Sequence, residues 1–400
     1  MGDDSTDFKQ LLSEATRLSL CEPRPSLAEL VLRLKRAFPA VRHETISLVS
    51  ETVQSRKIAA DKLGDWSREG LFTKALLEQA SRATIAEHRA TFFSGRSHML
   101  EIGTGTGSDT AALARVCAHI TTLEADPTRL EVAKHNLAVQ GISNVTFLQG
   151  EATDVIPLLD PTQFDAFFAD PARRTKEGTR VKDAELYSPP LEWLLSQDIG
   201  GIRAIKVSPG LFVDASERGW SRQFIGFGDE CLEQTLWFGA PIADSSAHLA
   251  DAHVTWEPSA NTTMLPAVAD SLEGFIVEPH GVINRSQYAH CFFAERSIAT
   301  IDPRVTYGIA LTKPSPSPWY ESFRILQAAP FHIKSLKSTL AGLAWTNRTE
   351  IKKRNYQGSP EEIREKLKLP SHTHGAPFGT IFIFTRDTTT WAVLAERLTE

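Results

Sequence analysis

The chain has 400 residues, and 42% of them are hydrophobic, which is ordinary for a globular protein of two or three domains. The formal net charge of −6 excludes a general nucleic-acid binder that relies on overall positive charge, so any such surface must be local. No apolar run approaches the about 20 residues of a membrane span, and the N-terminus lacks signal-peptide features, so we expect a cytoplasmic protein without a membrane partner. The 4 cysteines are far apart and the histidines show no ligand spacing, so we expect reduced thiols and no metal site.

Residues 1–90 are predicted to form a helical region. In SLAELVLRLKRAF the apolar residues recur at helical spacing, and Ser26 with Glu29 fits a capping box at the helix start. Amphipathic helices are mostly packing elements, so the pattern favours a cap on a following domain. A substrate-positioning module is the alternative.

The string MLEIGTGTGSDTAALA, residues 99–114, predicts a strand, a tight glycine turn and a helix start. Gly103, Gly105 and Gly107 permit positive φ and a close approach of a ligand, and a helix N-terminus offers free N–H groups. This is the architecture of a nucleotide-type cofactor site. The spacing differs from the dinucleotide fingerprint, and Glu101 before the turn would repel a pyrophosphate. The same carboxylate suits a cationic ligand such as S-adenosylmethionine.

Four further strands are predicted, and each ends in a candidate functional group. HITTLEAD ends at Glu124, which we expect to accept the ribose hydroxyls, and VTFLQGEATD ends near Glu151, placed to meet the adenine amino group. FDAFFADPARR ends at residues 170–173, and IRAIKVSPG ends at residues 208–210. Ligands of open α/β sheets bind at this carboxyl edge.

The order of these motifs over residues 95–260 resembles a class I S-adenosylmethionine-dependent methyltransferase. The resemblance implies a Rossmann-like α/β domain over residues 91–262. The cofactor-binding residues that it implies are Glu101, Gly103, Thr104, Gly105, Gly107, Glu124, Ala125, Glu151, Ala152 and Asp170. A Rossmann NAD(P) enzyme, or a degenerate domain that binds nothing, is the alternative.

Nucleic-acid amino-methyltransferases commonly end the fourth strand in (N/D)-P-P-(Y/F/W), where the first residue holds the target amine and the aromatic residue stacks on the base. Asp170 and Pro171 fit this pattern, but Ala172 replaces the second proline and Arg173 replaces the aromatic residue. We predict Asp170, Pro171 and Arg173 as catalytic residues, since arginine also stacks on bases or grips phosphates. A helix-capping role for Asp170 is the alternative.

Two other basic residues near this edge are left with open roles. Arg174 opens a short basic stretch that we assign to substrate contact, against the alternative of a solvated surface. Lys206 either meets the substrate or simply ends its strand. Carbon methylation of the uracil type is disfavoured, because no cysteine lies near the later strand ends except Cys231.

Residues 266–400 are predicted to form a small α+β domain. Its EIKKRN segment, the following Pro-Glu-Glu helix and the FIFTR strand resemble the THUMP-like domain that follows bacterial methyltransferase domains, with Asn355 where glycine is expected. The resemblance implies an RNA substrate, tRNA or rRNA. Positive charge is concentrated in this part of the chain, and we assign Lys352, Lys353 and Arg354 to RNA contact, against the alternative of ordinary surface charge. The closing segment GTIFIFTRDTTTWAVLAERL is expected to be a strand and then a helix.

Together these features predict an S-adenosylmethionine-dependent methyltransferase that modifies a base nitrogen in RNA, with the DPAR segment orienting the acceptor. Its expected fold class is an α/β Rossmann-like core with an N-terminal helical region and a C-terminal small α+β THUMP-like domain. Two alternatives are kept: an RNA-binding protein that binds the cofactor without catalysis, and a methyltransferase of small molecules or proteins.

Overall fold

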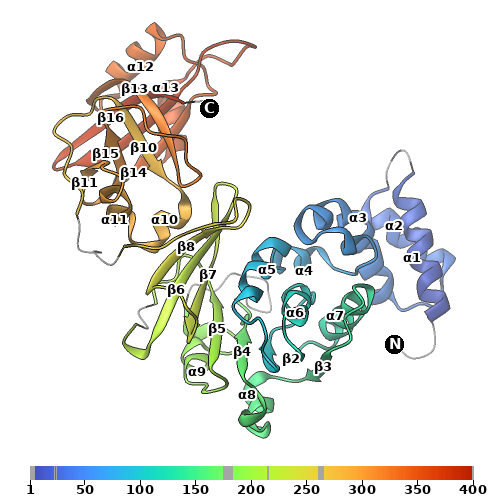
Figure 1. Cartoon of the computed structure of the whole chain (residues 1–400). Helices are drawn as coiled ribbons and strands as arrows, with labels where there is room; N and C mark the ends of the chain where they lie inside the picture. Colours follow the sequence, from blue (N-terminus) through green and yellow to red (C-terminus); the bar gives the residue numbers. More distant parts are fainter. Residues whose placement is uncertain are drawn as a thin grey trace. The chain divides into compact units, whose positions relative to one another are not determined.

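The computed structural model describes residues 5–21, 23, 25–173, 183–213, 216–259 and 265–398. The chain divides into two compact units, residues 1–221 with 235–241 and residues 222–234 with 242–400 (Figure 1). The N-terminal helices of the first unit are α1 (Ser5–Ser19), α2 (Leu27–Ala37), α3 (His43–Leu63), α4 (Lys74–Gln79) and α5 (Ala83–Thr91). Ser26 and Glu29 form the predicted reciprocal capping box at the start of α2.

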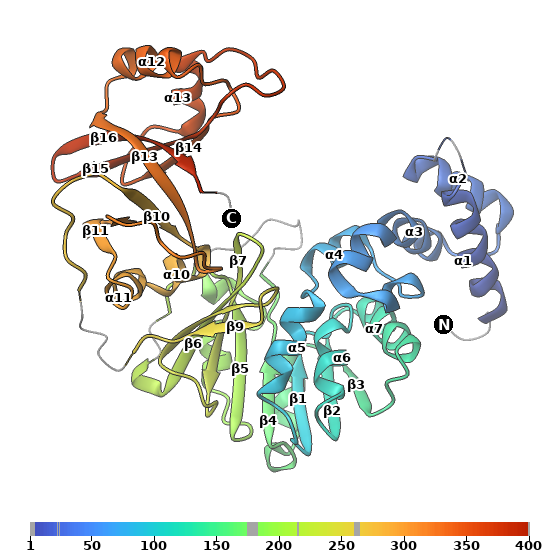
Figure 2. The ribbon, with the colours of Figure 1, turned by 45° about the horizontal axis from the view of Figure 1, so that its top comes forward.

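A parallel sheet forms the centre of the first unit. Its strands are β1 (His98–Ile102), β2 (His119–Glu124), β3 (Val145–Gln149), β4 (Ala166–Ala169) and β5 (Ile202–Val207), in the order β3-β2-β1-β4-β5. The connecting helices are α6 (Ser108–Ala114), α7 (Pro127–Val139), α8 (Ala152–Val155) and α9 (Leu191–Leu195), with 3₁₀ turns at Asp65–Arg68, Ile156–Leu158, Pro161–Gln163, Ala184–Leu186 and Ser216–Arg218. All five predicted strands are present, and the chain order reverses at β1, where the sheet extends to β2 on one side and β4 on the other (Figure 2). Ligands of open α/β sheets bind at such a switch point.

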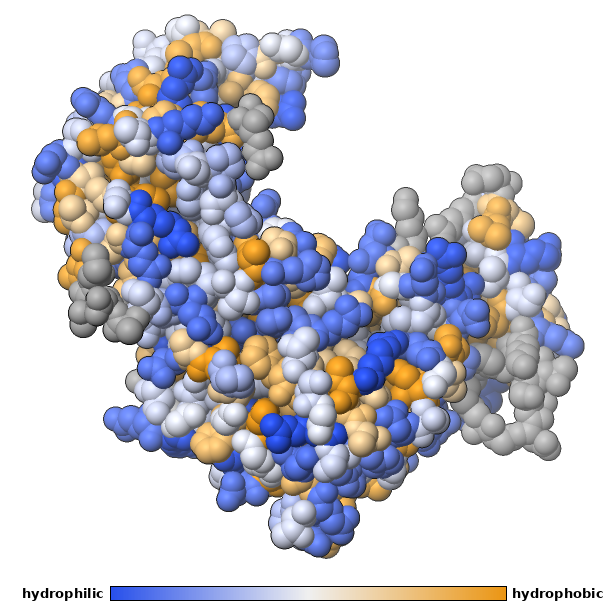
Figure 3. All heavy atoms as spheres, viewed as in Figure 1, coloured by the Kyte–Doolittle hydropathy of each residue, from blue (hydrophilic) through white to orange (hydrophobic). Residues whose placement is uncertain are grey.

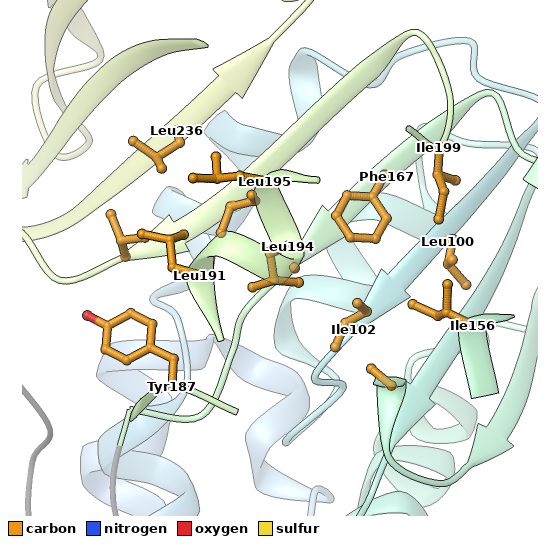
Figure 4. Close-up of a cluster of buried hydrophobic side chains, with 14 of the residues drawn as sticks. Leu100, Ile102, Ile156, Phe167, Tyr187, Leu191, Leu194, Leu195, Ile199 and Leu236 are labelled. Carbon is orange, nitrogen blue, oxygen red and sulfur yellow. The ribbon is translucent and has the colours of Figure 1, made fainter. Parts of the chain in front are cut away.

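The two faces of this sheet have different characters. Leu100 and Ile102 of β1 join Phe167 of β4 and Leu194 of α9 in a buried apolar cluster (Figure 4). Because successive side chains of a strand point to opposite faces, Glu101 lies on the other face, with α6. The hydrogen bond from Thr110 of α6 to Glu101 confirms this placement. One face is therefore dry and apolar, and the other carries charged groups toward the carboxyl edge.

The remaining strands of the chain form two groups in the second unit. The first group is β6 (Trp220–Phe227, of which 222–227 lie in this unit), β7 (Glu230–Phe238, of which 230–234 lie here), β8 (Ser245–Leu249) and β9 (Val254–Trp256). The second is a seven-stranded sheet in the order β11-β12-β10-β13-β16-β15-β14. Its strands are β10 (Phe275–Pro279), β11 (Ala299–Asp302), β12 (Val305–Ala310), β13 (Tyr320–Pro330), β14 (Glu350–Arg354), β15 (Thr380–Arg386) and β16 (Thr389–Arg397).

Four helices belong to the second unit: α10 (Gly281–Ser286), α11 (Ala289–Ala294), α12 (Ile333–Gly342) and α13 (Pro360–Leu367). In Figure 2, α12 and α13 lie beside β14–β16. They cover one face of the seven-stranded sheet through a core that includes Ile381 and Ile383, whereas Phe382 and Phe384 pack in a separate core. This alternation along β15 is the two-residue period of a strand buried on both faces.

The predicted elements around β14 are confirmed, and one prediction is wrong. Ser359 and Glu362 form a capping box at the start of α13, and Asn355 has a positive φ of 49°, so it replaces the expected glycine without loss of the turn. The expected closing helix is instead β16, which pairs antiparallel with β15. Asp387, at a φ of 53°, makes the hairpin turn, and the Thr-rich start of β16 suits a strand better than a helix.

Within the described ranges, no helix combines the length and the apolar character needed to cross a membrane. On the face shown in Figure 3, hydrophilic and hydrophobic residues are interspersed over each unit.

Candidate active site

The glycine turn after β1 is tightly constrained by the chain itself. Gly103 and Gly105 have φ values of 88° and 56°, and Gly107 has a φ of 80° before α6. A Cβ at Gly103 would collide with the backbone carbonyl oxygen of Asp170, so this glycine permits two backbone segments to meet. A Cβ at Gly105 would meet no atom within 4 Å. Only the second of these glycines therefore faces open space where a ligand could lie.

Glu101 is fully buried beside this turn. Its Oε2 accepts a hydrogen bond from the Thr110 hydroxyl at 2.7 Å, while Oε1 is buried and has no hydrogen-bond partner in the described structure. Burial raises the pKa of Glu101 to about 8, and the nearby carboxylates of Asp109 and Asp170 act in the same direction. The unpaired oxygen can form a hydrogen bond with a ligand, and a cationic ligand group beside it would favour the ionised form.

Glu124 at the end of β2 is oriented by the turn. Its Oε2 accepts the N–H of Gly105 at 2.9 Å, and its Oε1 accepts the N–H of Asp126 at 3.1 Å. Carboxylate oxygens have further lone pairs, so both oxygens can also accept ribose hydroxyl hydrogens. Thr104 is buried and shares a 2.6 Å hydroxyl contact with Thr122 of β2, which fixes the turn against the strand.

The remaining predicted cofactor residues lie along the same edge. Ala125 follows β2 and is exposed, and Glu151 follows β3 and is also exposed. Glu151 is the N-cap residue of α8, but its side chain makes no capping hydrogen bond. Ala152 is buried at the first turn of that helix. The predicted contact of Glu151 with a cofactor therefore stays a prediction, and its side chain does not cap α8.

The DPAR segment continues from β4 at this edge. The Asp170 N–H donates to the carbonyl oxygen of Ile102, and the backbone of Ala172 pairs with that of Ser188 in both directions, at 2.9 and 3.1 Å. Pro171 is buried and Arg173 is half-buried, with a buried Nη1 that has no hydrogen-bond partner among the described residues. Arg174, the next predicted substrate residue, lies outside the described ranges.

A chain of buried polar contacts joins Asp170 to the N-terminal helices. Lys206 Nζ donates to Asp170 Oδ2 at 2.8 Å and to Ser81 Oγ at 2.9 Å. Ser81 Oγ donates to Asp109 Oδ2 at 2.8 Å, and Arg89 pairs with Asp109 Oδ1 at 2.7 Å. Burial alone would raise the pKa of Asp109, but Arg89 and Lys206 outweigh it and hold this pKa below its usual range.

These contacts involve two residues whose roles the sequence left open and add one residue that it missed. Asp170 and Lys206 form an ion pair at the carboxyl ends of β4 and β5, and the roles assigned to both stay predictions. Ser81 was missed, because it lies 125 residues from Lys206 and carries no motif. Phe212 was also missed; it follows β5 and is 65% exposed, which is unusual for phenylalanine.

The predicted RNA-contacting residues of the second unit are partly engaged within the chain. Lys352 on β14 is 16% exposed and pairs with Glu278, with Glu321 at 3.4 Å and with Glu350 at 3.6 Å. Arg354 also pairs with Glu278, at 3.4 Å. Lys353 donates to the carbonyl oxygen of Tyr356 at 3.1 Å and is half-buried.

Comparisons with known proteins agree with this geometry. A family model described as a methyltransferase domain matches residues 94–185, and one described as THUMP domain-like matches residues 320–397. An uncharacterized S-adenosylmethionine-dependent methyltransferase of Mycobacterium tuberculosis is 28% identical over 338 residues, which cover 80% of this chain and 88% of that protein. A tRNA (guanine-N(7)-)-methyltransferase of Mycobacterium bovis is 28% identical over 144 residues, which cover 33% of this chain and 55% of that protein.

A crystal structure of a proposed methyltransferase from Porphyromonas gingivalis W83 has the same fold, with a TM-score of 0.75 at 17% identity and full coverage of both chains. The fold is therefore of the Rossmann-like α/β class, and residues 94–185 match the methyltransferase family model. More particularly, the chain carries a methyltransferase domain followed by a C-terminal THUMP-like domain, as its motifs predicted. Within the described part of the chain, no group of histidine, cysteine and acidic side chains could hold a metal ion.

Proposed function

We propose that this protein transfers a methyl group from S-adenosylmethionine to a base nitrogen of RNA. The family match and the M. tuberculosis relative support the coarser assignment, a methyltransferase that depends on this cofactor. The observation that supports the site is the meeting of the glycine turn with the DPAR segment, where Gly103 lies against the Asp170 carbonyl. Cofactor site and acceptor site are thereby adjacent.

The residues of the turn fit the cofactor. Glu101 has an unpartnered buried oxygen suited to a cationic amino group, and Gly105 faces open space. Glu124 is held with its carboxylate toward the turn, and Glu151 is exposed at the next strand end. We assign these residues, with Thr104, Gly107, Ala125 and Ala152, to cofactor binding. When bound, the cofactor supplies an electrophilic methyl group on a sulfonium.

Asp170 is proposed to orient the acceptor. Its carboxylate accepts a hydrogen bond from the N–H of the target amine, which directs the nitrogen lone pair toward the methyl group. With the cofactor bound, the sulfonium would give its methyl group to the nitrogen and keep the electrons of the C–S bond, and Asp170 would accept the proton that the nitrogen loses. Pro171 shapes this turn, and Arg173 contacts the base or its phosphate. Phe212 supplies the stacking surface that DPAR lacks.

RNA is proposed as the substrate because of the THUMP-like domain and the similarity to a tRNA methyltransferase. We propose that residues 1–90, 91–262 and 266–400 act as helical, catalytic and RNA-binding parts. Since Lys352 and Arg354 form ion pairs, exposed Lys334 and Lys337 on α12 are better placed for phosphates, together with Lys353. Arg174 is proposed as a further substrate contact.

The direct test uses the purified full chain with methyl-labelled cofactor and bulk RNA from a strain that lacks the gene. The proposal predicts label that becomes soluble on ribonuclease digestion. Protein and small-molecule extracts from the same strain serve as parallel acceptors. Label in either of these, with none in RNA, would replace the RNA proposal by the second alternative.

A further inference from the structure

Lys206 links the proposed acceptor-binding carboxylate to the N-terminal helical region. Its side chain is 4% exposed, whereas that of Asp170 is 20% exposed. We propose that Lys206 and Ser81 are positioning residues that hold the Asp170 carboxylate in the orientation that methyl transfer requires. This inference rests on the proposed function, because Lys206 and Ser81 hold the carboxylate to which that function assigns the acceptor.

The sheet register places the two charges together. Ala169 of β4 pairs with Ile205 of β5, so Asp170 and Lys206, one residue further along each strand, meet at the carboxyl edge. Ile205 and Val207 belong to the apolar cluster on one face, so Lys206 points to the other face, toward α5 and α6. The position of the ammonium group is therefore determined by the strand.

The contact is asymmetric in a way that suits catalysis. Lys206 engages Oδ2 of Asp170, and Oδ1 has no hydrogen bond within the described ranges. Since Asp170 is partly exposed and Lys206 is not, the oxygen that Lys206 holds is on the protein side of the pair, and we assign the other oxygen to the acceptor amine. Fixing one oxygen sets the direction of the other, and orientation of reacting groups contributes much of the rate in transfer reactions.

Ser81 extends the support beyond the sheet. It lies between α4 and α5, where its hydroxyl accepts a hydrogen bond from Lys206 and donates one to Asp109. Arg89 of α5 forms an ion pair with Asp109. Buried ion pairs add little net stability compared with apolar residues of similar size. A lysine placed behind a partly exposed aspartate is therefore better explained by positioning than by folding. The N-terminal helical region thereby contributes a hydroxyl to the active site, beyond covering the domain.

The test compares Lys206→Met and Ser81→Ala with Lys206→Arg and with a matched control, Arg203→Met. Arg203 lies on the same strand, is 10% exposed in its side chain and pairs with Asp198 at 3.1 Å, on the strand's other end. The readouts are kcat and KM on bulk RNA from the gene-deletion strain, cofactor affinity by calorimetry, and unfolding of the free protein in denaturant.

We expect Lys206→Met to lower kcat about 100-fold with cofactor affinity within about threefold of wild type. Ser81→Ala should lower kcat less, Lys206→Arg should restore part of the loss, and Arg203→Met should keep kcat within about threefold. In an Asp170→Asn background, Lys206→Met should cause no further loss of kcat. Additive losses, or wild-type kcat in Lys206→Met, would overturn the inference.

A double-mutant cycle on the free protein tests the link without RNA. Replacing Lys206 and Asp170 singly and together should show a coupling of at least about threefold in the unfolding equilibrium constant. No coupling would overturn the inference whatever the substrate. A wild-type protein that leaves RNA unlabelled would contradict the proposed substrate instead, and this cycle would still decide whether Lys206 holds Asp170.

Discussion

Gly103 and Asp170 meet backbone to backbone: the carbonyl oxygen of Asp170 occupies the position where any side chain at residue 103 would begin. The glycine turn after β1 and the DPAR segment after β4 are therefore parts of one structure. Neighbouring strands bring them together, because Ile102 pairs with Ala169 at the ends of β1 and β4. The glycine turn and Asp170 are thus held together at the same edge of the sheet.

The two glycines of the turn should respond differently to alanine. Gly103→Ala forces a backbone shift in addition to an unfavourable φ, and should lower the free energy of unfolding by about 2–3 kcal/mol. Gly105→Ala has open space around it and should cost about 1 kcal/mol. Its methyl group nevertheless enters the proposed cofactor space, so calorimetry should show at least about tenfold weaker binding of S-adenosylmethionine. Unchanged affinity in Gly105→Ala would remove this glycine from the cofactor site.

Glu101 should release a proton when the cofactor binds. Because the pKa of Glu101 is about 8, its carboxyl group is largely protonated at pH 7 in the protein without cofactor. A cationic amino group nearby favours the ionised form of this carboxyl group. Calorimetry in buffers of different ionisation enthalpy should detect release of up to about one proton per cofactor. Glu101→Gln should abolish this release. Equal release in both proteins would show that another group is responsible.

The same carboxyl predicts a pH dependence of stability. The folded pKa of about 8 lies above the ordinary value of 4.5, so between these pH values the folded protein binds a proton that the unfolded chain has lost. This contribution to stability is complete below pH 4.5 and declines as the pH rises to about 8. The free energy of unfolding of Glu101→Gln relative to wild type should therefore rise with pH, by at most about 1.4 kcal/mol per pH unit. A difference that is constant with pH would contradict the raised pKa.

Phe212 should contribute to acceptor binding and not to cofactor binding. Stacking of an aromatic ring on a base contributes about 1–3 kcal/mol, so Phe212→Ala should raise KM for RNA about tenfold or more with unchanged cofactor affinity. Leu158→Ala is the matched control, because Leu158 is also exposed but lies before β4, away from the carboxyl edge. Equal effects of the two substitutions would argue against stacking by Phe212.

The basic residues of the THUMP-like domain should separate into structural and RNA-contacting groups. Lys352→Met removes a cation from Glu278, whose side chain is 13% exposed, and leaves that carboxylate with Arg354 alone, so the free energy of unfolding should fall by about 1–3 kcal/mol. The double substitution Lys334→Glu and Lys337→Glu should leave stability nearly unchanged. It should weaken RNA binding and reduce the slope of log K against log salt. An unchanged salt slope would place the RNA surface elsewhere.

Local sequence signals predicted much of this molecule. The capping boxes at Ser26 and Ser359, the five parallel strands and the glycine turn depend on residues close together in the chain, and all are present. The last strand, β16, was mistaken for a helix, because TTWAVLAER contains both strand-favouring and helix-favouring residues. Its pairing with β15 decides between them.

Contacts between distant residues could not be predicted in this way. Lys206 and Ser81 are 125 residues apart, and Lys352 and Glu278 are 74 residues apart, so neither pair is visible in a local pattern. The two contacts affect the predicted sites in opposite ways. The first contact adds a positioning chain to the candidate site, and the second engages the charge of a residue that we had assigned to RNA.

Mass spectrometry of nucleosides from digested RNA detects the proposed methyl transfer directly. RNA from the deletion strain is compared with RNA from strains complemented by the wild-type gene or by Asp170→Asn, with both proteins present at equal levels. The account predicts that one base-methylated nucleoside is absent in the deletion strain, restored by the wild type and not restored by Asp170→Asn. Identical nucleoside profiles in all three strains would contradict it.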